Sequence, residues 1–280
     1  MMLEEAFRRD RIVIDAALRK ALATERGVPR RLAQAMGYAL LGGGKRIRPF
    51  LALEGFRAAG GRQSGRVLRF CCGLEMVHAF SLVHDDLPSM DNADVRRGRA
   101  SLHRRFDEAT AILAADALLA RGFGLMAESP GPRVRVCRVI SLVARAIGAA
   151  GMTGGQWEDM RPGRMTLARL AAVQRRKTGE LIAASLAGGA ILAGAGHDVE
   201  RALWQAGLAV GACFQMTDDL LDAAEGGERK GSTMVGRLGR ERTLRRARAA
   251  AGRARALLTG LGPRFALLAE VPGYVLERKD

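Results

Sequence analysis

The chain has 280 residues, of which 48% are hydrophobic and 5% aromatic, and its formal net charge at pH 7 is +16. Scarce aromatic residues and a lack of alternating Val/Ile-rich runs argue against a sheet protein. The longest weakly polar stretch, residues 185–196, is too short to span a bilayer, and the first residues lack a signal-peptide core, so we expect no transmembrane segment.

Apolar residues recur at three- and four-residue spacing through most of the chain, with interruptions at Gly or Pro. The expected helices cover residues 4–24, 29–41, 48–59, 64–86, 107–127, 132–150, 166–175, 178–194, 198–223, 238–258 and 264–270. About ten helices without strands predict an all-α fold, in which residues 1–280 form a single helical bundle. The four cysteines show no metal-type spacing, which favours a reduced, cytoplasmic location.

An acidic segment, "DDLPSMD" at residues 85–91, directly follows an apolar run. Carboxylates at the end of an apolar helix repel one another and lose hydration, so they need water or a cation. Pro88 should end the helix just after Asp85 and Asp86. Asp91 can return to Asp85 only if the chain bends at residues 87–89.

A second acidic segment, "FQMTDDLLD", lies at residues 214–222. Asp218 and Asp222 are four residues apart and therefore share one helix face, whereas Asp219 points elsewhere. Carboxylates without His or Cys nearby are hard oxygen ligands, which suit Mg²⁺ together with substrate phosphates. The two segments therefore predict a phosphorylated substrate bridged by metal, although a single Asp-Asp pair usually marks a solvated helix end.

Basic residues supply further partners for phosphate. They occur in "LGGGKRIRP" (41–49), where glycines allow close backbone approach, in "DVRRGRAS" (94–101) and in "RRKTGE" (175–180). The residues concerned are Lys45, Arg46, Arg48, Arg96, Arg97, Lys177 and Thr178. Together these segments predict two anionic pockets, one bridged by metal and one held directly by Lys and Arg.

Six motifs occur in one order: "GGGKRIRP", "EMVHAFSLVHDDLPSMDNADVRRG", "ATAILAADALL", "GMTGGQWEDM", "KTGELI" and "GACFQMTDDLLD". Through them, from about residue 35 to the C-terminus, the chain resembles the trans-isoprenyl diphosphate synthases (polyprenyl synthases), most closely the bacterial short-chain type that makes farnesyl diphosphate. The resemblance implies the isoprenoid synthase fold, a bundle around a central cavity between the Asp motifs. It also implies a homodimer.

The resemblance assigns roles residue by residue. About three Mg²⁺ ions, with Mn²⁺ as an alternative, would be held by Asp85, Asp91, Asp218 and Asp222, with Asp86 in support. The allylic diphosphate would contact Arg96, Lys177, Thr178, Gln215 and Lys230. Isopentenyl diphosphate would contact Lys45, Arg48, His78 and Arg97. Asp85, Asp86, Asp91, Asp218 and Lys177 would be the catalytic residues, and Gln156 would belong to the same cavity.

The implied reaction joins an allylic diphosphate to isopentenyl diphosphate and lengthens it by five carbons. Phe80 lies five residues before Asp85, about 7–8 Å along a helix, and in the resembled family a large aromatic there stops growth near fifteen carbons. Ser81 beside it is small and adds no barrier. Farnesyl diphosphate is therefore the expected product, with geranylgeranyl diphosphate as the alternative, unless Phe80 only packs against a neighbouring helix.

The chain departs from the family pattern at several positions. Asn92 and Ala93 stand where acids are usual, Asp107 replaces a customary Gly, and the loop after Asp222 is short. The short loop favours one rival interpretation, a weakly active subunit that partners another synthase. A terpene cyclase would not need the Lys45/Arg48/Arg97 pocket. A nucleic-acid binder is favoured by net charge alone, without aromatic residues among the basic ones, and we expect no nucleic-acid partner.

Overall fold

A computed structural model describes residues 3–161, 163, 165–224 and 233–278. These residues form two compact units. The first consists of Leu3–Leu53 and Gln63–Ile140, and the second of Glu54–Arg62 and the described part of 141–280. The chain passes from one unit to the other within α3 (Ile47–Ala58) and α7 (Arg133–Ile147). That residues 1–280 form a single domain stays a prediction.

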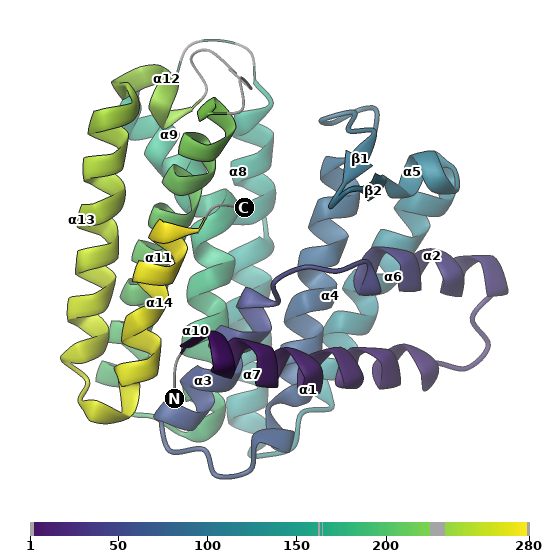
Figure 1. Ribbon diagram of the computed structural model, residues 1–280. Helices are drawn as coiled ribbons and strands as arrows, with labels where there is room; N and C mark the ends of the chain where they lie inside the picture. The colour runs from purple at the N-terminus through teal and green to yellow at the C-terminus, as the bar shows by residue number, and fades with distance from the viewer. Residues whose placement is uncertain (1–2, 162, 164, 225–232, 279–280) are drawn as a thin grey trace. The chain divides into compact units, whose positions relative to one another are not determined.

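Helices dominate the first unit. They are α1 (Leu3–Ala23), α2 (Arg30–Leu41), the first part of α3, the 3-10 turn Ser64–Arg66, α4 (Leu68–Asp85), α5 (Leu102–Arg105), α6 (Glu108–Ala127) and the first part of α7. Helix α4 is buried on most sides and packs along α6 (Figure 1). A Cβ atom at Gly73 would lie 2.6 Å from the carbonyl oxygen of Gly122, so glycine is required for the two helices to approach this closely.

A short hairpin follows the first acidic segment, where no strand was expected. Strands β1 (Val95–Arg96) and β2 (Arg99–Ala100) pair antiparallel. The two loop residues, Arg97 and Gly98, have φ values of 54° and 71°, as a type I′ hairpin turn requires. The sequence did not predict this hairpin, because the basic residues in it leave no alternation of apolar residues. The fold remains all-α.

The second unit is also helical. Besides the rest of α3 and α7 it contains α8 (Met152–Asp159), α9 (Leu167–Gln174), the π-helical turn Arg175–Gly179, α10 (Glu180–Ala193), α11 (His197–Ala224), α12 (Met234–Leu238), α13 (Arg240–Thr259), the 3-10 turn Pro263–Phe265 and α14 (Ala266–Glu277). The helix expected at 178–194 thus begins within the last two residues of the π-helical turn and continues as α10, and the one expected at 264–270 continues past Pro272. Both α5 and α12 are too short for apolar residues to show helical spacing in the sequence.

Close packing fixes the position of α11 in this unit. A Cβ atom at Gly207 would lie 2.4 Å from the Cα atom of Ala183 in α10. A Cβ atom at Gly211 would lie 2.5 Å from the Cα atom of Gly179 in the π-helical turn. The acidic end of α11 is therefore held in register with the turn that carries Lys177 and Thr178.

Two stretches, Glu108–Ala127 and Arg133–Asp159, are long and apolar enough to cross a membrane by length and composition alone, although none was expected. In each, 39% of the most apolar window is buried inside the protein. Core helices of soluble proteins share these properties, so the two stretches are weak evidence for a membrane span.

We predict that Gly211→Ala destabilises the protein by about 1–3 kcal/mol, because the new methyl group would overlap the backbone of the π-helical turn. The matched control is Gly252→Ala in α13, where a Cβ atom would meet nothing within 4 Å. The control should gain about 0.5–1 kcal/mol from helix propensity. Urea unfolding of both variants checks the prediction, and an unchanged midpoint for Gly211→Ala would show that this contact tolerates a side chain.

Candidate active site

The first acidic segment forms a tight turn at the end of α4. The backbone N–H of Asp91 donates to the carbonyl oxygen of Asp85 at 2.9 Å, and that of Asn92 donates to Leu87 at 3.0 Å. The predicted bend is confirmed, since the backbone of Asp91 returns to Asp85. Asn92 has a φ of 48°, a left-handed conformation that Asn adopts more readily than most residues. Asn92, which departs from the family pattern, therefore favours the backbone conformation of this turn.

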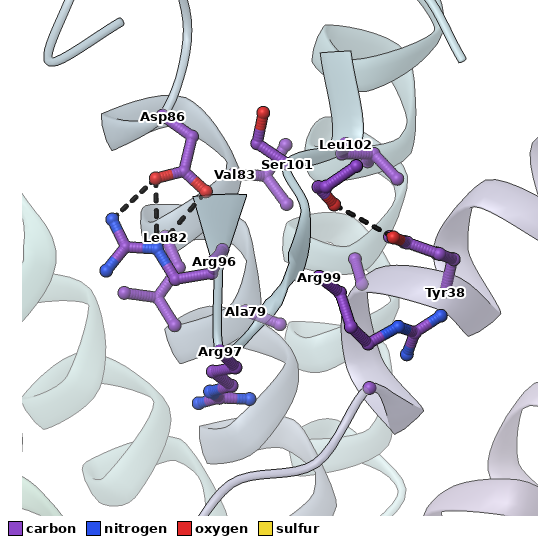
Figure 2. A pocket seen from close by; sticks show the side chains of 13 residues that line it. Tyr38, Ala79, Leu82, Val83, Asp86, Arg96, Arg97, Arg99, Ser101 and Leu102 are labelled. Atoms are coloured by element: carbon purple, nitrogen blue, oxygen red, sulfur yellow. Dashed lines mark hydrogen bonds and ion pairs between the residues drawn. The ribbon is translucent and has the colours of Figure 1, made fainter. Parts of the chain in front are cut away.

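Asp86 binds the hairpin rather than facing solvent. Its side chain is buried and accepts a hydrogen bond at 3.0 Å from Nε of Arg96 in β1, with a second from Nη2 (Figure 2). This bond to Asp86 is the main cause that raises the pKa of Arg96. The protein therefore neutralises Asp86 itself, and the supporting role of Asp86 toward a metal stays a prediction.

The glycine-rich loop and the hairpin meet through Arg97. Its guanidinium donates to the carbonyl oxygen of Gly43 at 2.7 Å. Gly44 has a φ of 116°, and a Cβ atom there would lie 2.8 Å from the guanidinium carbon of Arg97. Only glycine fits this approach. The loop that carries Lys45 is thus joined to one of the arginines expected to share its ligand.

Arg48 and His78, both expected at the isopentenyl diphosphate, are in contact, with Nη1 and Nε2 3.1 Å apart. An arginine only donates hydrogen bonds, so Nε2 accepts and the neutral ring carries its proton on Nδ1. Burial, followed by the positive charges of Arg48 and Arg97, lowers the pKa of His78 well below its usual value. His78 therefore orients Arg48 as a neutral acceptor.

Arg46 has a structural role that the motif did not reveal. Its buried guanidinium donates to Glu75 at 2.6 Å, to Asp15 at 2.9 Å and to the carbonyl oxygen of Leu40 at 2.9 Å. These partners lie on α4, α1 and α2 respectively. Arg46 also has a φ of 53°, an uncommon conformation for a residue with a side chain. A buried Glu75 within an apolar helix was the signal available in the sequence.

A small cavity of about 40 Å³ lies between α2, α4 and the hairpin (Figure 2). The apolar residues Leu82 and Val83 line it together with the basic residues Arg97 and Arg99. The guanidinium of Arg99 stacks 3.9 Å from the ring centre of Tyr38, which holds the hairpin on α2. A space of this size takes a water molecule or two and no prenyl diphosphate.

The two residues expected to set chain length occupy the middle of α4. Phe80 is partly buried, and its ring lies 4.6 Å from that of His84 in an edge-on contact, one turn along the same helix. Ser81 donates from Oγ to the carbonyl oxygen of His78 at 2.9 Å. Their role in product length stays a prediction.

In the second unit, Asp218 is held beside Arg278. The guanidinium of Arg278 donates to Asp218 and to the carbonyl oxygen of Phe214, and stacks 3.7 Å over the Phe214 ring. Burial raises the pKa of Asp218 to about 6, with a further increase from Asp222 and an opposing effect of Arg278. Asp222 is exposed one turn further along α11. This partly desolvated carboxylate would be stabilised by an added cation.

The side chain of Asp219 is bound by other parts of the protein. It does not share the helix face of Asp218 and Asp222, as expected. It is buried and accepts hydrogen bonds from Gln174 at 3.1 Å and from the backbone N–H of Met234 at 2.8 Å. Gln215 reaches the same carboxylate at 3.5 Å and accepts from Thr178 at 2.9 Å. The chain of contacts links α9, the π-helical turn, α11 and α12.

The π-helical turn presents Lys177, whose Nζ donates to Asp159 of α8 at 2.9 Å. Turns of this type are frequent at functional sites because they redirect side chains. Sequence reasoning missed Asp159, although "WEDM" stands in one of the family motifs. Nearby in sequence, Gln156 is 8% exposed, and neither its amide nitrogen nor its oxygen finds a partner among the described residues. An unpaired buried amide suits a ligand or a water molecule.

The donor chemistry fits Mg²⁺ with substrate oxygens completing its shell. Within the described ranges, no three His, Cys, Asp or Glu side chains gather closely enough to hold a metal on their own. Mg²⁺ is commonly held by one or two carboxylates together with waters and phosphates, so the sequence hypothesis does not require a cluster of three side chains. Lys230 lies outside the described residues. The metal ligands stay predictions.

Comparisons with known proteins agree with the motifs. A family model described as polyprenyl synthetase matches residues 29–236. The chain is 40% identical to a farnesyl diphosphate synthase of Geobacillus stearothermophilus over 84% of its length and 80% of that protein. It is 39% identical to one of Micrococcus luteus over 83% and 80%. A solved FPP/GFPP synthase of Zymomonas mobilis superposes with a TM-score of 0.90 at 32% identity, covering 98% of both chains.

The raised pKa of Asp218 predicts a pH-dependent stability. The folded pKa of about 6 exceeds the unfolded value of about 3.9, so ionisation of Asp218 costs stability as the pH rises between them. Without metal, Asp218→Asn should therefore unfold at a higher temperature than wild type above about pH 7, and the gain should vanish below about pH 4. Glu270→Gln, at an exposed position on α14, is the control and should match wild type at both. A gain in unfolding temperature that persists unchanged at low pH would contradict the statement that the buried charge of Asp218 lowers stability.

Proposed function

The chain belongs to the polyprenyl synthetase family and is a trans-prenyltransferase, and from this premise we propose that it condenses an allylic diphosphate with isopentenyl diphosphate. One observation carries the proposal. A glycine-lined basic loop, with Arg97 against it, stands in the same unit as the carboxylate turn 85–91. A site that binds one diphosphate through metal and another through Lys and Arg needs both parts.

The allylic diphosphate would bind through the two acidic segments. We assign Asp85 and Asp91 to one group of metal ligands and Asp218 and Asp222 to the other, with about three Mg²⁺ in total, or Mn²⁺ in its place. When bound, the metal would neutralise charge that develops on the diphosphate as it leaves. That the two segments act on one substrate is part of the proposal.

Three further residues would contact the same diphosphate. Lys177 is oriented by Asp159, and Thr178 and Gln215 are oriented by their mutual hydrogen bond. A group held in place before the substrate binds stabilises the leaving diphosphate without reorganisation at the moment of reaction. Arg96 would add its charge while it stays bound to Asp86.

Isopentenyl diphosphate would bind at Lys45, Arg48 and Arg97. Because His78 accepts from Arg48, it fixes that guanidinium instead of adding a charge of its own. The double bond of the bound molecule would attack the allylic carbon after the C–O bond breaks. Loss of a proton, which the released diphosphate would accept, completes a five-carbon extension. Apolar walls would keep water from the cation in the meantime.

Farnesyl diphosphate is the proposed product, and geranylgeranyl diphosphate the alternative. The support is Phe80, which is partly buried five residues before Asp85 and contacts only His84 among the aromatic rings of the described residues. An aromatic side chain at this depth would stop the growing chain, whereas Ser81 would not.

We propose that the protein acts as a soluble cytoplasmic homodimer. Helix α6 exposes Ile112 and Leu113, at 40% and 59%, next to the exposed Ala109 and Ala120 on the same face. The exposed Asp116 lies among these residues, so the face carries one acid, and its exposed apolar side chains are stabilised when a second copy covers them.

We predict that Asp85→Ala lowers kcat by about 10³-fold or more, because charge stabilisation supplies much of the barrier reduction. The control is Asp94→Ala, which removes an exposed carboxylate that bonds Arg104 and lies outside the proposed site. It should retain most of its activity. Steady-state rates with Mg²⁺, and with excess chelator, test both statements. Normal turnover of Asp85→Ala, or of wild type in chelator, contradicts the metal assignment.

We predict that Phe80→Ala lengthens the product by one or more five-carbon units and leaves turnover within about tenfold of wild type, since the change opens space without removing charge. Phe106→Ala, which removes a ring that contacts Tyr38, is the control and should leave the product unchanged. Chromatography of the dephosphorylated products gives the chain length. The fifteen-carbon assignment fails if wild type already releases twenty-carbon product.

A further inference from the structure

Helix α13 carries seven arginines in twenty residues and only one acid, Glu241. Its buried side consists of Thr243 and small or apolar residues that face α11 and α14 (Figure 1). All the arginines lie on the exposed side. The chain thus concentrates much of its positive charge on one straight surface, which at 1.5 Å per residue is about 30 Å long.

The arginines form two rows. At 100° per residue, Arg242, Arg246 and Arg253 fall within about 40° of one another, and Arg245, Arg248 and Arg255 form a second row. Ala249 and Ala256 lie between the rows and are exposed. These methyl groups are too small to hold the rows apart from a flat surface. The six arginines span about 180° of the helix, so those beside the alanines face a planar partner directly and the long side chains of the outer ones reach it from the two edges.

Most of this charge has no partner among the residues that the structure describes. Arg245 pairs with Glu241 at 2.6 Å, but Arg242, Arg246, Arg248, Arg253 and Arg255 make no hydrogen bond or ion pair with any residue in the described part of the chain. Some exposed arginines elsewhere are paired with acids, for example Arg31 with Asp107 at 2.9 Å. Like charges three and four residues apart destabilise a helix. An anionic partner would remove that repulsion.

We propose that the exposed face of α13, defined by Arg242, Arg245, Arg246, Arg248, Arg253 and Arg255, binds the anionic surface of a lipid bilayer. The two rows match a planar array of phosphate headgroups, to which each arginine contributes near the surface. No large apolar side chain stands on the face, so the contact is electrostatic, reversible and sensitive to salt.

The choice of lipid over nucleic acid rests on the proposed function and on the composition of the face. The product of the proposed reaction has a long apolar chain, which favours release next to a bilayer. Single-stranded nucleic acid is commonly bound by basic residues together with aromatic side chains on which bases stack, and α13 has none. The face also lies apart in sequence from every residue assigned to the reaction.

Sedimentation of the full-length protein with phosphatidylcholine vesicles, with and without phosphatidylglycerol, tests the proposal. The variant is Arg242→Gln/Arg246→Gln/Arg253→Gln. The control is Arg8→Gln/Arg19→Gln/Arg62→Gln, which removes the same charge from exposed positions off α13. Wild type should bind only the anionic vesicles. This binding should disappear in about 1 M NaCl, where the Debye length is about 3 Å. The α13 variant should bind about 100-fold more weakly, and the control within about tenfold of wild type.

Equal losses in the two triple variants would assign binding to net charge and overturn the proposal, as would an absence of binding to anionic vesicles. Tighter binding of single-stranded RNA than of anionic vesicles, through the same three arginines, also overturns it. Both triple variants should keep wild-type condensation rates in the absence of vesicles. A wild type that binds vesicles through α13 but condenses no substrate would contradict the proposed function and leave this surface assigned.

Discussion

Charge held at the ends of apolar helices is the constraint that shapes the acidic segment of each unit. Each acidic segment contains an Asp-Asp pair, and in each pair the protein binds the second carboxylate itself. Asp86 is bound by Arg96, and Asp219 by Gln174 and the backbone of Met234. The first of each pair, Asp85 or Asp218, lies on the partly exposed side. Asp218 is also paired with Arg278, yet burial still raises its pKa to about 6, and a partly desolvated carboxylate of this kind is stabilised by an added cation.

In the first unit a buried positive charge is compensated by acidic side chains. Arg46 is buried, and its positive charge is shared between Glu75 and Asp15 on two helices, with Leu40 as a third acceptor. Removing one member of such a group would leave an uncompensated buried charge. The network fixes Arg46 in the chain directly after Lys45 and two residues before Arg48 of α3. Rigid placement of this kind is what a diphosphate site requires.

The sequence predicted the helical class, most helix positions, the family and the bend that returns Asp91 to Asp85. Those features depend on local patterns: apolar spacing, Pro88, and motifs of residues close in the chain. It did not predict the hairpin, because Arg97 and Gly98 carry no apolar alternation, nor the π-helical turn, which depends on packing against Gly211. The partners of Lys177 and Arg46 were missed for the same reason. Asp159, Asp15 and Glu75 are distant in sequence, and only the fold brings them into contact.

One assay tests the central claim most directly. Purified wild-type protein is supplied with Mg²⁺, isopentenyl diphosphate and each allylic primer in turn, and the products are identified by chain length. The account predicts condensation that stops at fifteen carbons and is lost when the metal is chelated. Release of diphosphate without condensation, with every primer tested, would contradict it.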